Sequence, residues 1–119
     1  MLARLILVVG VLGLGTSCDL MPCENQPLAE VPSPDGSFSA WVIERDCGAT
    51  TGFSTQVSIL PEGEGPPLEG GNALVIDARA RVVPSWRGRD QLHISFERSG
   101  KVFLQESRVA DIEVTYGYE

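Results

Sequence analysis

The stretch Gln91-Leu92-His93-Ile94-Ser95-Phe96 alternates polar and apolar side chains without a break. Successive side chains of a β-strand point to opposite faces of a sheet, so the pattern places Leu92, Ile94 and Phe96 together on one face. Strict alternation over six residues is typical of a half-buried strand. The stretch therefore predicts a β-strand with its apolar face on a core and with His93 on the polar face.

The chain on the C-terminal side of this strand continues the pattern. Ser99-Gly100-Lys101 indicates a hairpin turn, and residues 102–106 return from it. Residues 109–116 alternate again. We therefore expect two further strands after the first.

The chain on the N-terminal side adds three more predicted strands. Pro34-Asp35-Gly36-Ser37 is a turn signal, because proline presets φ and glycine accepts a positive φ. The first predicted strand after this turn is residues 38–47, which is apolar on both faces and hence interior. The second is residues 54–60, with one buried face. The third is residues 73–76, for which a helical turn is the alternative. Residues 61–71 are too rich in Gly and Pro for a strand, and residues 79–86 are irregular or an edge.

These patterns together predict a single all-β domain over residues 35–119. No window of a dozen residues after the first 18 has helical spacing. About six short strands separated by turns favour a small antiparallel sandwich or open barrel.

Residues 1–18, Met1-Leu2-Ala3-Arg4-Leu5-Ile6-Leu7-Val8-Val9-Gly10-Val11-Leu12-Gly13-Leu14-Gly15-Thr16-Ser17-Cys18, have the layout of a secretory signal. The end of this run, Gly15-Thr16-Ser17-Cys18, resembles the lipobox of bacterial lipoproteins, although Gly15 stands where that family prefers leucine. The resemblance implies a signal peptide over 1–17, a lipid on Cys18, a tether over 18–34, and a membrane-anchored protein of the bacterial cell envelope. An ordinary secretory signal and an uncleaved anchor are the alternatives, and the latter is disfavoured by the short apolar run.

The remaining cysteines form an even pair once Cys18 is assigned to the lipid. Cys23 and Cys47 are expected to form a disulfide, because an exported protein meets an oxidising compartment. The alternative, a nucleophilic Cys47, needs a base, and the only histidine is His93. Two thiols and one imidazole at scattered positions also lack the close ligand pairs of a zinc site, so we expect no metal and no cofactor.

The charges are unevenly distributed along the chain. Residues 18–78 carry ten acidic side chains and one base, Arg45, whereas residues 79–119 carry seven bases and six acids. An acidic chain is repelled by nucleic acid and by anionic lipid headgroups, so neither is expected as a direct partner of the domain.

Two further resemblances concern the body of the chain. Ser33-Pro34-Asp35-Gly36-Ser37-Phe38-Ser39-Ala40 resembles the turn and strand of TolB-like propeller blades, and Pro84-Ser85-Trp86-Arg87-Gly88-Arg89-Asp90-Gln91-Leu92-His93-Ile94 resembles the same element. The chain is too short to form a propeller. The resemblance therefore implies only a local element, a turn that leads into a buried strand. The stretch Arg45-Asp46-Cys47-Gly48-Ala49-Thr50-Thr51 is similar to a group of small uncharacterised exported bacterial proteins, which supports export and leaves function open.

Two segments are candidate binding sites. The hydroxyl-rich loop after Cys47, with Thr50, Thr51 and Gln56, could bind a polar ligand, or it could simply bond to its own backbone. Arg87 and Arg89, with Arg79 and Arg81, could recognise carboxylate or phosphate, or they could be solvated turn residues. An exposed Trp86 beside Arg87 would be typical of a binding hot spot, and a core position is the alternative.

The prediction for function is accordingly a tethered protein-binding or structural module of the cell envelope. The alternative is an inhibitor of a wall-degrading enzyme or toxin, since an acidic body suits a basic target. An enzyme is not expected, because Ser95, His93 and Asp90 on one strand do not have the geometry of a catalytic triad.

Overall fold

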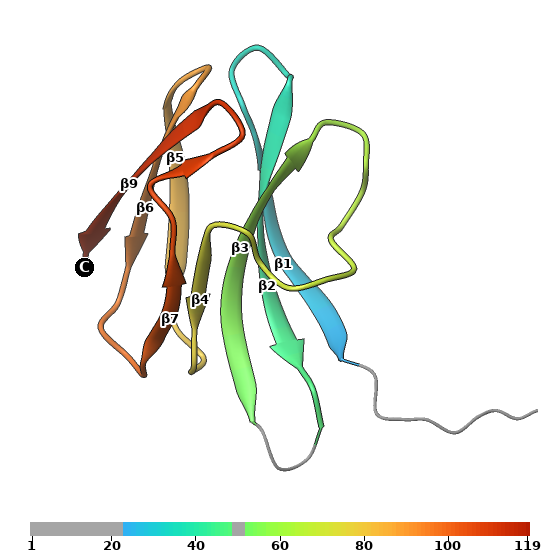
Figure 1. Ribbon diagram of the computed structural model, residues 1–119, viewed down its shortest axis with the longest axis vertical. Coiled ribbons are helices and arrows are strands. Elements are labelled where there is room, and N and C mark those ends of the chain that lie inside the picture. Colours follow the sequence, from blue (N-terminus) through green and yellow to red (C-terminus); the bar gives the residue numbers. More distant parts are fainter. Residues whose placement is uncertain (1–22, 49–51) are drawn as a thin grey trace, which may run out of the picture.

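The computed structural model describes residues 23–48 and 52–119, and these form nine strands in two sheets (Figure 1). The strands are β1 (Glu24–Pro32), β2 (Phe38–Asp46), β3 (Phe53–Pro61), β4 (Leu74–Ile76), β5 (Val82–Gly88), β6 (Gln91–Phe96), β7 (Val102–Gln105), β8 (Arg108–Val109) and β9 (Ile112–Tyr118). The first sheet has the order β1-β2-β3-β4-β7 and the second β5-β6-β9-β8. The all-β prediction is confirmed, and the two sheets form a small sandwich that is not a closed barrel.

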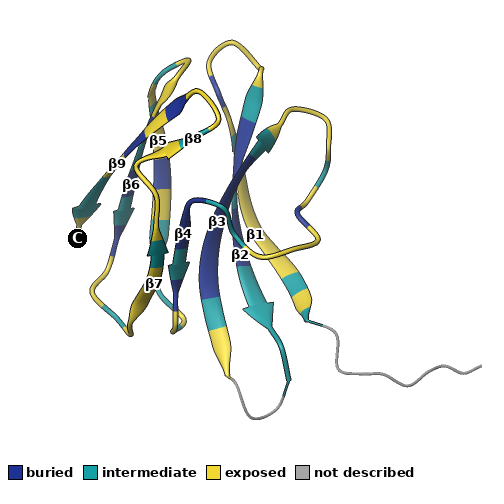
Figure 2. Cartoon of the chain, in the orientation of Figure 1, coloured by how far each residue is buried: buried dark blue, intermediate teal, exposed yellow. Residues whose placement is uncertain are grey.

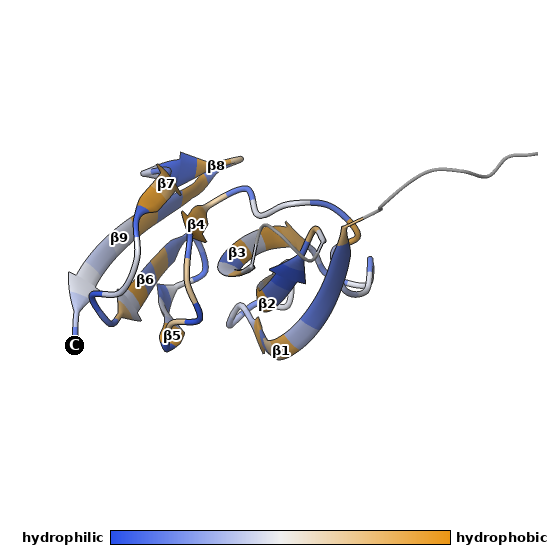
Figure 3. Ribbon diagram, turned by 90° about the horizontal axis from the view of Figure 1, so that it is seen from below, coloured by the Kyte–Doolittle hydropathy of each residue, from blue (hydrophilic) through white to orange (hydrophobic). Residues whose placement is uncertain are grey.

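The hydrophobic core lies between the two sheets (Figures 2 and 3). Leu92, Ile94 and Phe96 of β6 are buried, as their alternation predicts. The other sheet contributes Ala40, Val42, Val57, Ile59, Leu74 and Ile76. At about 25 cal/mol for each Å² of apolar surface removed from water, this contact is the main source of the stability of the fold.

The interior position predicted for residues 38–47 is confirmed, because β2 pairs with β1 on one side and with β3 on the other. β3 differs from its prediction of a single buried face. Gln56 and Ser58 are 7% and 2% exposed, although they point away from the core that Val57 and Ile59 line. The loop after β3 covers them, which converts a half-exposed strand into one buried on both faces.

The largest correction concerns the tether predicted over residues 18–34. Residues 24–32 of it are β1, an edge strand paired antiparallel with β2 along its whole length. Proline and exposed polar residues suggested irregular chain, but an edge strand tolerates both, because one of its sides makes no ladder hydrogen bonds. The domain therefore begins by Cys23, and the predicted signal peptide and Cys18 lie outside the described residues.

The sheet connections correct the sequence prediction in two further ways. The segment around Ser99-Gly100-Lys101 is not a hairpin, because β6 and β7 belong to different sheets and the chain crosses between them. β6 and β9 pair in parallel, with Leu92 opposite Val114, so the second sheet is mixed. Strand alternation predicts that a segment is extended and carries no information on which strand it joins.

Both segments that resemble propeller blades contain the expected local element. In the first, Asp35 accepts hydrogen bonds from the Ser37 backbone N–H and the Ser33 hydroxyl, at 3.1 and 2.9 Å. These bonds, the backbone one foremost, hold the pKa of the Asp35 carboxyl below its usual value. The turn leads into β2, and the turn after Gly88 leads into β6, so each turn precedes a buried strand.

Candidate functional site

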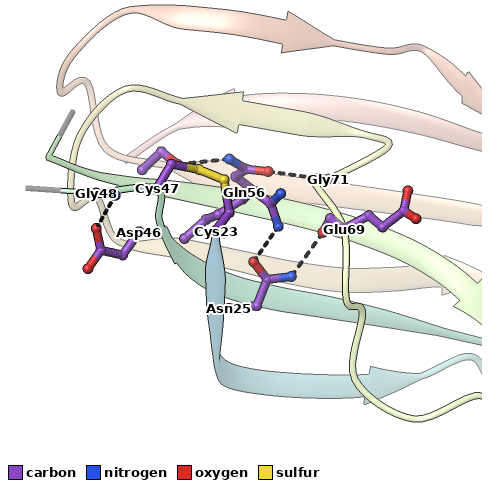
Figure 4. Close-up of a disulfide and its surroundings, with 10 residues drawn as sticks. Cys23, Asn25, Asp46, Cys47, Gly48, Gln56, Glu69 and Gly71 are labelled. Carbon is purple, nitrogen blue, oxygen red and sulfur yellow. Dashed lines mark hydrogen bonds between the residues drawn. A yellow bond between two sulfur atoms is a disulfide. The ribbon is translucent and has the colours of Figure 1, made fainter. Parts of the chain in front are cut away.

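The predicted disulfide is present and ties the start of β1 to the end of β2. Cys23 and Cys47 are bonded across a sequence separation of 24 residues (Figure 4). The bond lies beside the first ladder pair of the two strands, Glu24 with Asp46. It therefore holds in place the end of an edge strand that would otherwise fray, and with it Asn25, which lies two residues further along β1.

Asn25 uses both ends of its side-chain amide in this region. Its Oδ1 accepts a hydrogen bond from Arg45 Nη1 at 2.7 Å, and its Nδ2 donates to the carbonyl oxygens of Pro67 and Glu69 at 2.8 and 2.9 Å. The contact with Glu69 is drawn in Figure 4. Asn25 thus joins β1 to a loop more than forty residues away in sequence.

A second side-chain amide holds the same loop from β3. Gln56 Oε1 accepts a hydrogen bond from the backbone N–H of Gly71 at 2.6 Å, and its Nε2 donates to the Ser54 hydroxyl at 2.8 Å (Figure 4). Nearby, the side chain of Asn72 bonds both the N–H and the C=O of Ile59, at 2.8 and 2.9 Å. Gln56 was a candidate either for ligand contact or for bonding within its own segment, and its buried amide fastens the loop that covers it.

The three amides hold residues 62–72 as a fixed arm over the outer face of the first sheet. The two bonds from Asn25 bracket Leu68, whose side chain is left 88% exposed. A hollow of about 400 Å³ lies on one side of Leu68 and includes Ser58 and Leu60; a second, of about 430 Å³, lies on the other and includes Cys23 and Pro27. We call residues 66–68, which border both hollows, the Leu68 ridge.

The ridge lies in acidic surroundings. Residues 61–71 carry Glu62, Glu64 and Glu69, and β1 carries Glu24 and Glu30, while neither segment contains Lys or Arg. Glu30 and Glu62 both accept from the buried hydroxyl of Ser39, at 2.9 and 2.7 Å. A hydroxyl has one proton, so it serves one carboxylate at a time.

The other predicted site residues are not gathered at this site. Thr50 and Thr51 lie outside the described residues. Trp86 is half-buried against the core, and its indole N–H donates to the Val31 carbonyl at 2.8 Å, which links the two sheets. Arg87 and Arg89 are exposed at the end of β5 opposite to Arg79 and Arg81, so the four arginines do not form one group.

The geometry around His93 does not bring Ser95, His93 and Asp90 together as a catalytic triad. His93 Nδ1 lies 2.8 Å from the Thr115 hydroxyl on the neighbouring strand. Within the described residues, neither Ser95 nor Asp90 is a hydrogen-bond partner of His93. His93 is half-buried on the outer face of the second sheet, where alternation places it.

Sequence reasoning missed the two residues that define the site, Asn25 and Leu68. Asn25 was assigned to a tether, and its role depends on the register of β1, which the sequence pattern does not reveal. The Pro66-Pro67 pair was a usable signal, because it stiffens the segment that presents Leu68.

No family model, curated protein or solved structure matches the chain, and no helix in its described part is long and apolar enough to cross a bilayer.

Proposed function

We propose that this chain is a lipoprotein of the bacterial cell envelope, anchored through Cys18, and that its β domain binds a protein partner through the Leu68 ridge. The lipobox-like end of residues 1–18 supports the anchor. The single observation that supports binding is a large apolar side chain left 88% exposed by a loop that three buried or half-buried amides hold in place.

A physical argument connects that geometry to binding. An exposed leucine gains about 1.5–3 kcal/mol when a partner buries it fully. Ordering a loop on association costs free energy, and a loop already ordered by its own hydrogen bonds avoids much of that cost. The hollows on either side of the ridge offer room for partner side chains to pack against its two exposed residues, Pro66 and Leu68.

The experiment that tests this proposal places a photo-crosslinking amino acid at Leu68 in cells. Val83, which is 45% exposed on the other sheet, is the matched control position. We expect one dominant adduct from position 68, absent from position 83 and weakened by Asn25→Asp. Equal adduct patterns from both positions would contradict the proposal, and an unacylated mass at Cys18 would contradict the anchor.

The acidic surroundings of the ridge favour one second candidate, an inhibitor of a basic wall-degrading enzyme or toxin. Opposite charges speed association and favour correct partners. The purified domain should then slow a basic lysozyme, and Leu68→Ser should abolish this effect. If several basic lysozymes keep full activity in the presence of excess domain, this candidate is wrong.

A further inference from the structure

The correction to the tether changes where the domain stands relative to its anchor. Four residues separate Cys18 from Cys23, and Cys23 is bonded into the domain. Fully extended chain spans at most about 3.6 Å per residue, so Cys23 lies within about 20 Å of a lipidated Cys18. Given the proposed lipid anchor, on which this inference rests, the end of the domain that holds the disulfide is therefore adjacent to the bilayer.

That end of the sandwich gathers segments distant in sequence. β1, β3, β5 and β7 begin there, and β2, β4, β6 and β9 end there, as the register of each pair requires. Figure 1 shows it as the lower part of the molecule, and Figure 3 looks onto it from below. The connections on this end include residues 77–81 and 97–101.

Three exposed aromatic side chains lie at this end, and each has a cation over its ring. Arg79 is 3.8 Å from the ring centroid of Phe53, Arg98 is 3.6 Å from that of Tyr118, and Lys101 is 5.7 Å from that of Phe103. The aromatic residues are 37%, 55% and 62% exposed, respectively. Within residues 23–48 and 52–119, these three are the only pairs of a cation and an aromatic ring, and all three lie at this end.

The position of Phe103 has an identifiable cause. The pairing of β4 with β7 shifts register so that Val75 faces Leu104 and Ile76 faces Val102, which leaves Phe103 as the extra residue of a β-bulge. Bulges redirect side chains and are frequent beside functional sites. The bulge is what leaves a phenylalanine ring in solvent, beside Lys101, at the end nearest the anchor.

Aromatic rings paired with long cationic side chains match the chemistry of a bilayer interface. Tyrosine settles at the level of the lipid headgroups, phenylalanine inserts at the boundary between headgroups and acyl chains, and Arg and Lys extend past the rings to reach phosphate. Such a surface gains apolar contact from the rings and electrostatic contact from the cations in one geometry.

The local charge differs from that of the whole chain. Arg79 is paired with Glu44 and Arg81 with Glu119, at 3.2 and 2.9 Å, so these charges largely cancel. The other charged groups at this end are the acids Glu24, Asp46, Glu69, Asp77 and Glu97 and the bases Arg45, Arg98 and Lys101. This end thus has only a small acidic excess, and three further acids, Asp35, Glu62 and Glu64, lie at the opposite end, where they are directed away from a bilayer.

We propose that the surface formed by Phe53, Phe103, Tyr118 and their three cations, here named the tether-end surface, contacts the phospholipid headgroups. The lipid anchor then does not leave the domain free to rotate. The contact orients the sandwich upright on the membrane. It directs the turn at 33–37 and the start of the arm formed by residues 62–72 away from the bilayer.

The test compares hydrogen exchange of the full processed protein in two settings. One sample is held in nanodiscs of phosphatidylcholine and phosphatidylglycerol, and the other in detergent micelles. We expect backbone amides of residues 77–81 and 97–103 to exchange more slowly in the nanodiscs, and those of 33–37 and 61–65 to be unchanged. Identical exchange in both samples, or protection confined to 61–71, would overturn the proposal.

Matched variants separate lipid contact from folding. Phe103→Ser with Tyr118→Ser should lose the protection, while Leu28→Ser with Leu68→Ser, which also removes two exposed apolar side chains, should keep it. If the first variant proves unstable, Arg98→Glu with Lys101→Glu replaces it with the rings intact. If the protein is acylated but shows no protection, the proposed membrane contact of the tether-end surface is wrong and the lipoprotein proposal stands. If the mass of the acyl groups is absent, the lipoprotein proposal is wrong. Vesicles added to the secreted domain then test the tether-end surface by itself.

Discussion

At the scale of single residues, Tyr116 shows how one oxygen joins the two sheets. It belongs to β9, and its hydroxyl lies 3.0 Å from the Ala73 carbonyl and 2.7 Å from the Glu106 carbonyl, which flank β4 and β7. Burial, followed by the nearby Glu106 carboxylate, raises the pKa of Tyr116 to about 12. A phenolate at this position would face two carbonyl oxygens with no proton to share.

This raised pKa predicts a specific alkaline instability. An unfolded tyrosine titrates at about 10. Because the folded pKa is higher, the stabilisation is complete below pH 10 and is lost as the pH rises towards 12. Tyr116→Phe should lower the free energy of unfolding by about 1 kcal/mol at neutral pH and remove part of the alkaline decline. Urea titrations across this pH range test it, with Tyr118→Phe as the control, and equal slopes for all three proteins would contradict it.

Asn25 carries a second prediction at this scale. Asn25→Asp keeps the acceptor for Arg45 but replaces two N–H donors with an oxygen that faces two carbonyl oxygens. We expect a loss of about 1–3 kcal/mol in the free energy of unfolding, with faster hydrogen exchange of the backbone amides of residues 68–71. Gln26→Glu is the same chemical change on the exposed neighbouring residue and should be nearly neutral. Equal effects of the two variants would show that charge alone, and not the lost donors, is responsible.

At the scale of elements, alternation predicted strands reliably where one face is buried and the other polar. Residues 91–96 became β6 with the expected faces, and the cysteine pair predicted the disulfide. β1 was missed because an edge strand with Pro27 and Pro32 has almost no apolar period. The sequence did not predict that β6 pairs in parallel with β9, nor that the arm buries residues such as Gln56. Both features depend on register and long-range packing, which a local pattern does not encode.

The seating of the arm, residues 62–72, can be tested by comparing alanine substitutions at its two adjacent glycines, Gly70 and Gly71. A Cβ on Gly71 would lie 2.7 Å from the Val57 carbonyl oxygen and 3.0 Å from that of Leu74, both backbone atoms. On Gly70 the nearest heavy atom would be Gln56 Oε1 at 3.4 Å, an ordinary contact. Gly71→Ala should therefore destabilise the domain by about 1–3 kcal/mol and Gly70→Ala much less. Thermal unfolding of both variants decides it, and a neutral Gly71→Ala would mean that the arm is not seated as described.

At the scale of the whole molecule, each of the four sheet edges in the described part has a feature that hinders pairing with another strand. β1 contains Pro27, Pro32 and a register shift, β5 contains Pro84 and a register shift, β7 has the bulge at Phe103, and β8 has two residues. Proline, bulges and short strands are the devices by which natural sheets avoid edge-to-edge association. They are consistent with a domain whose contacts are made by its faces and ends.

A change in oligomeric state tests that argument. The purified domain should sediment as a monomer across a wide concentration range, because no edge presents an uninterrupted ladder. Replacing both edge prolines, Pro27→Thr with Pro32→Thr, restores two N–H donors to the longest edge and should produce concentration-dependent association. Pro66→Thr, the same substitution in the arm, should leave the protein monomeric. A doubly substituted β1 that stays monomeric would show that the prolines are not needed and that the acidic side chains of that strand are sufficient to prevent association. A dimeric parent protein would show that neither the prolines nor those acids prevent it.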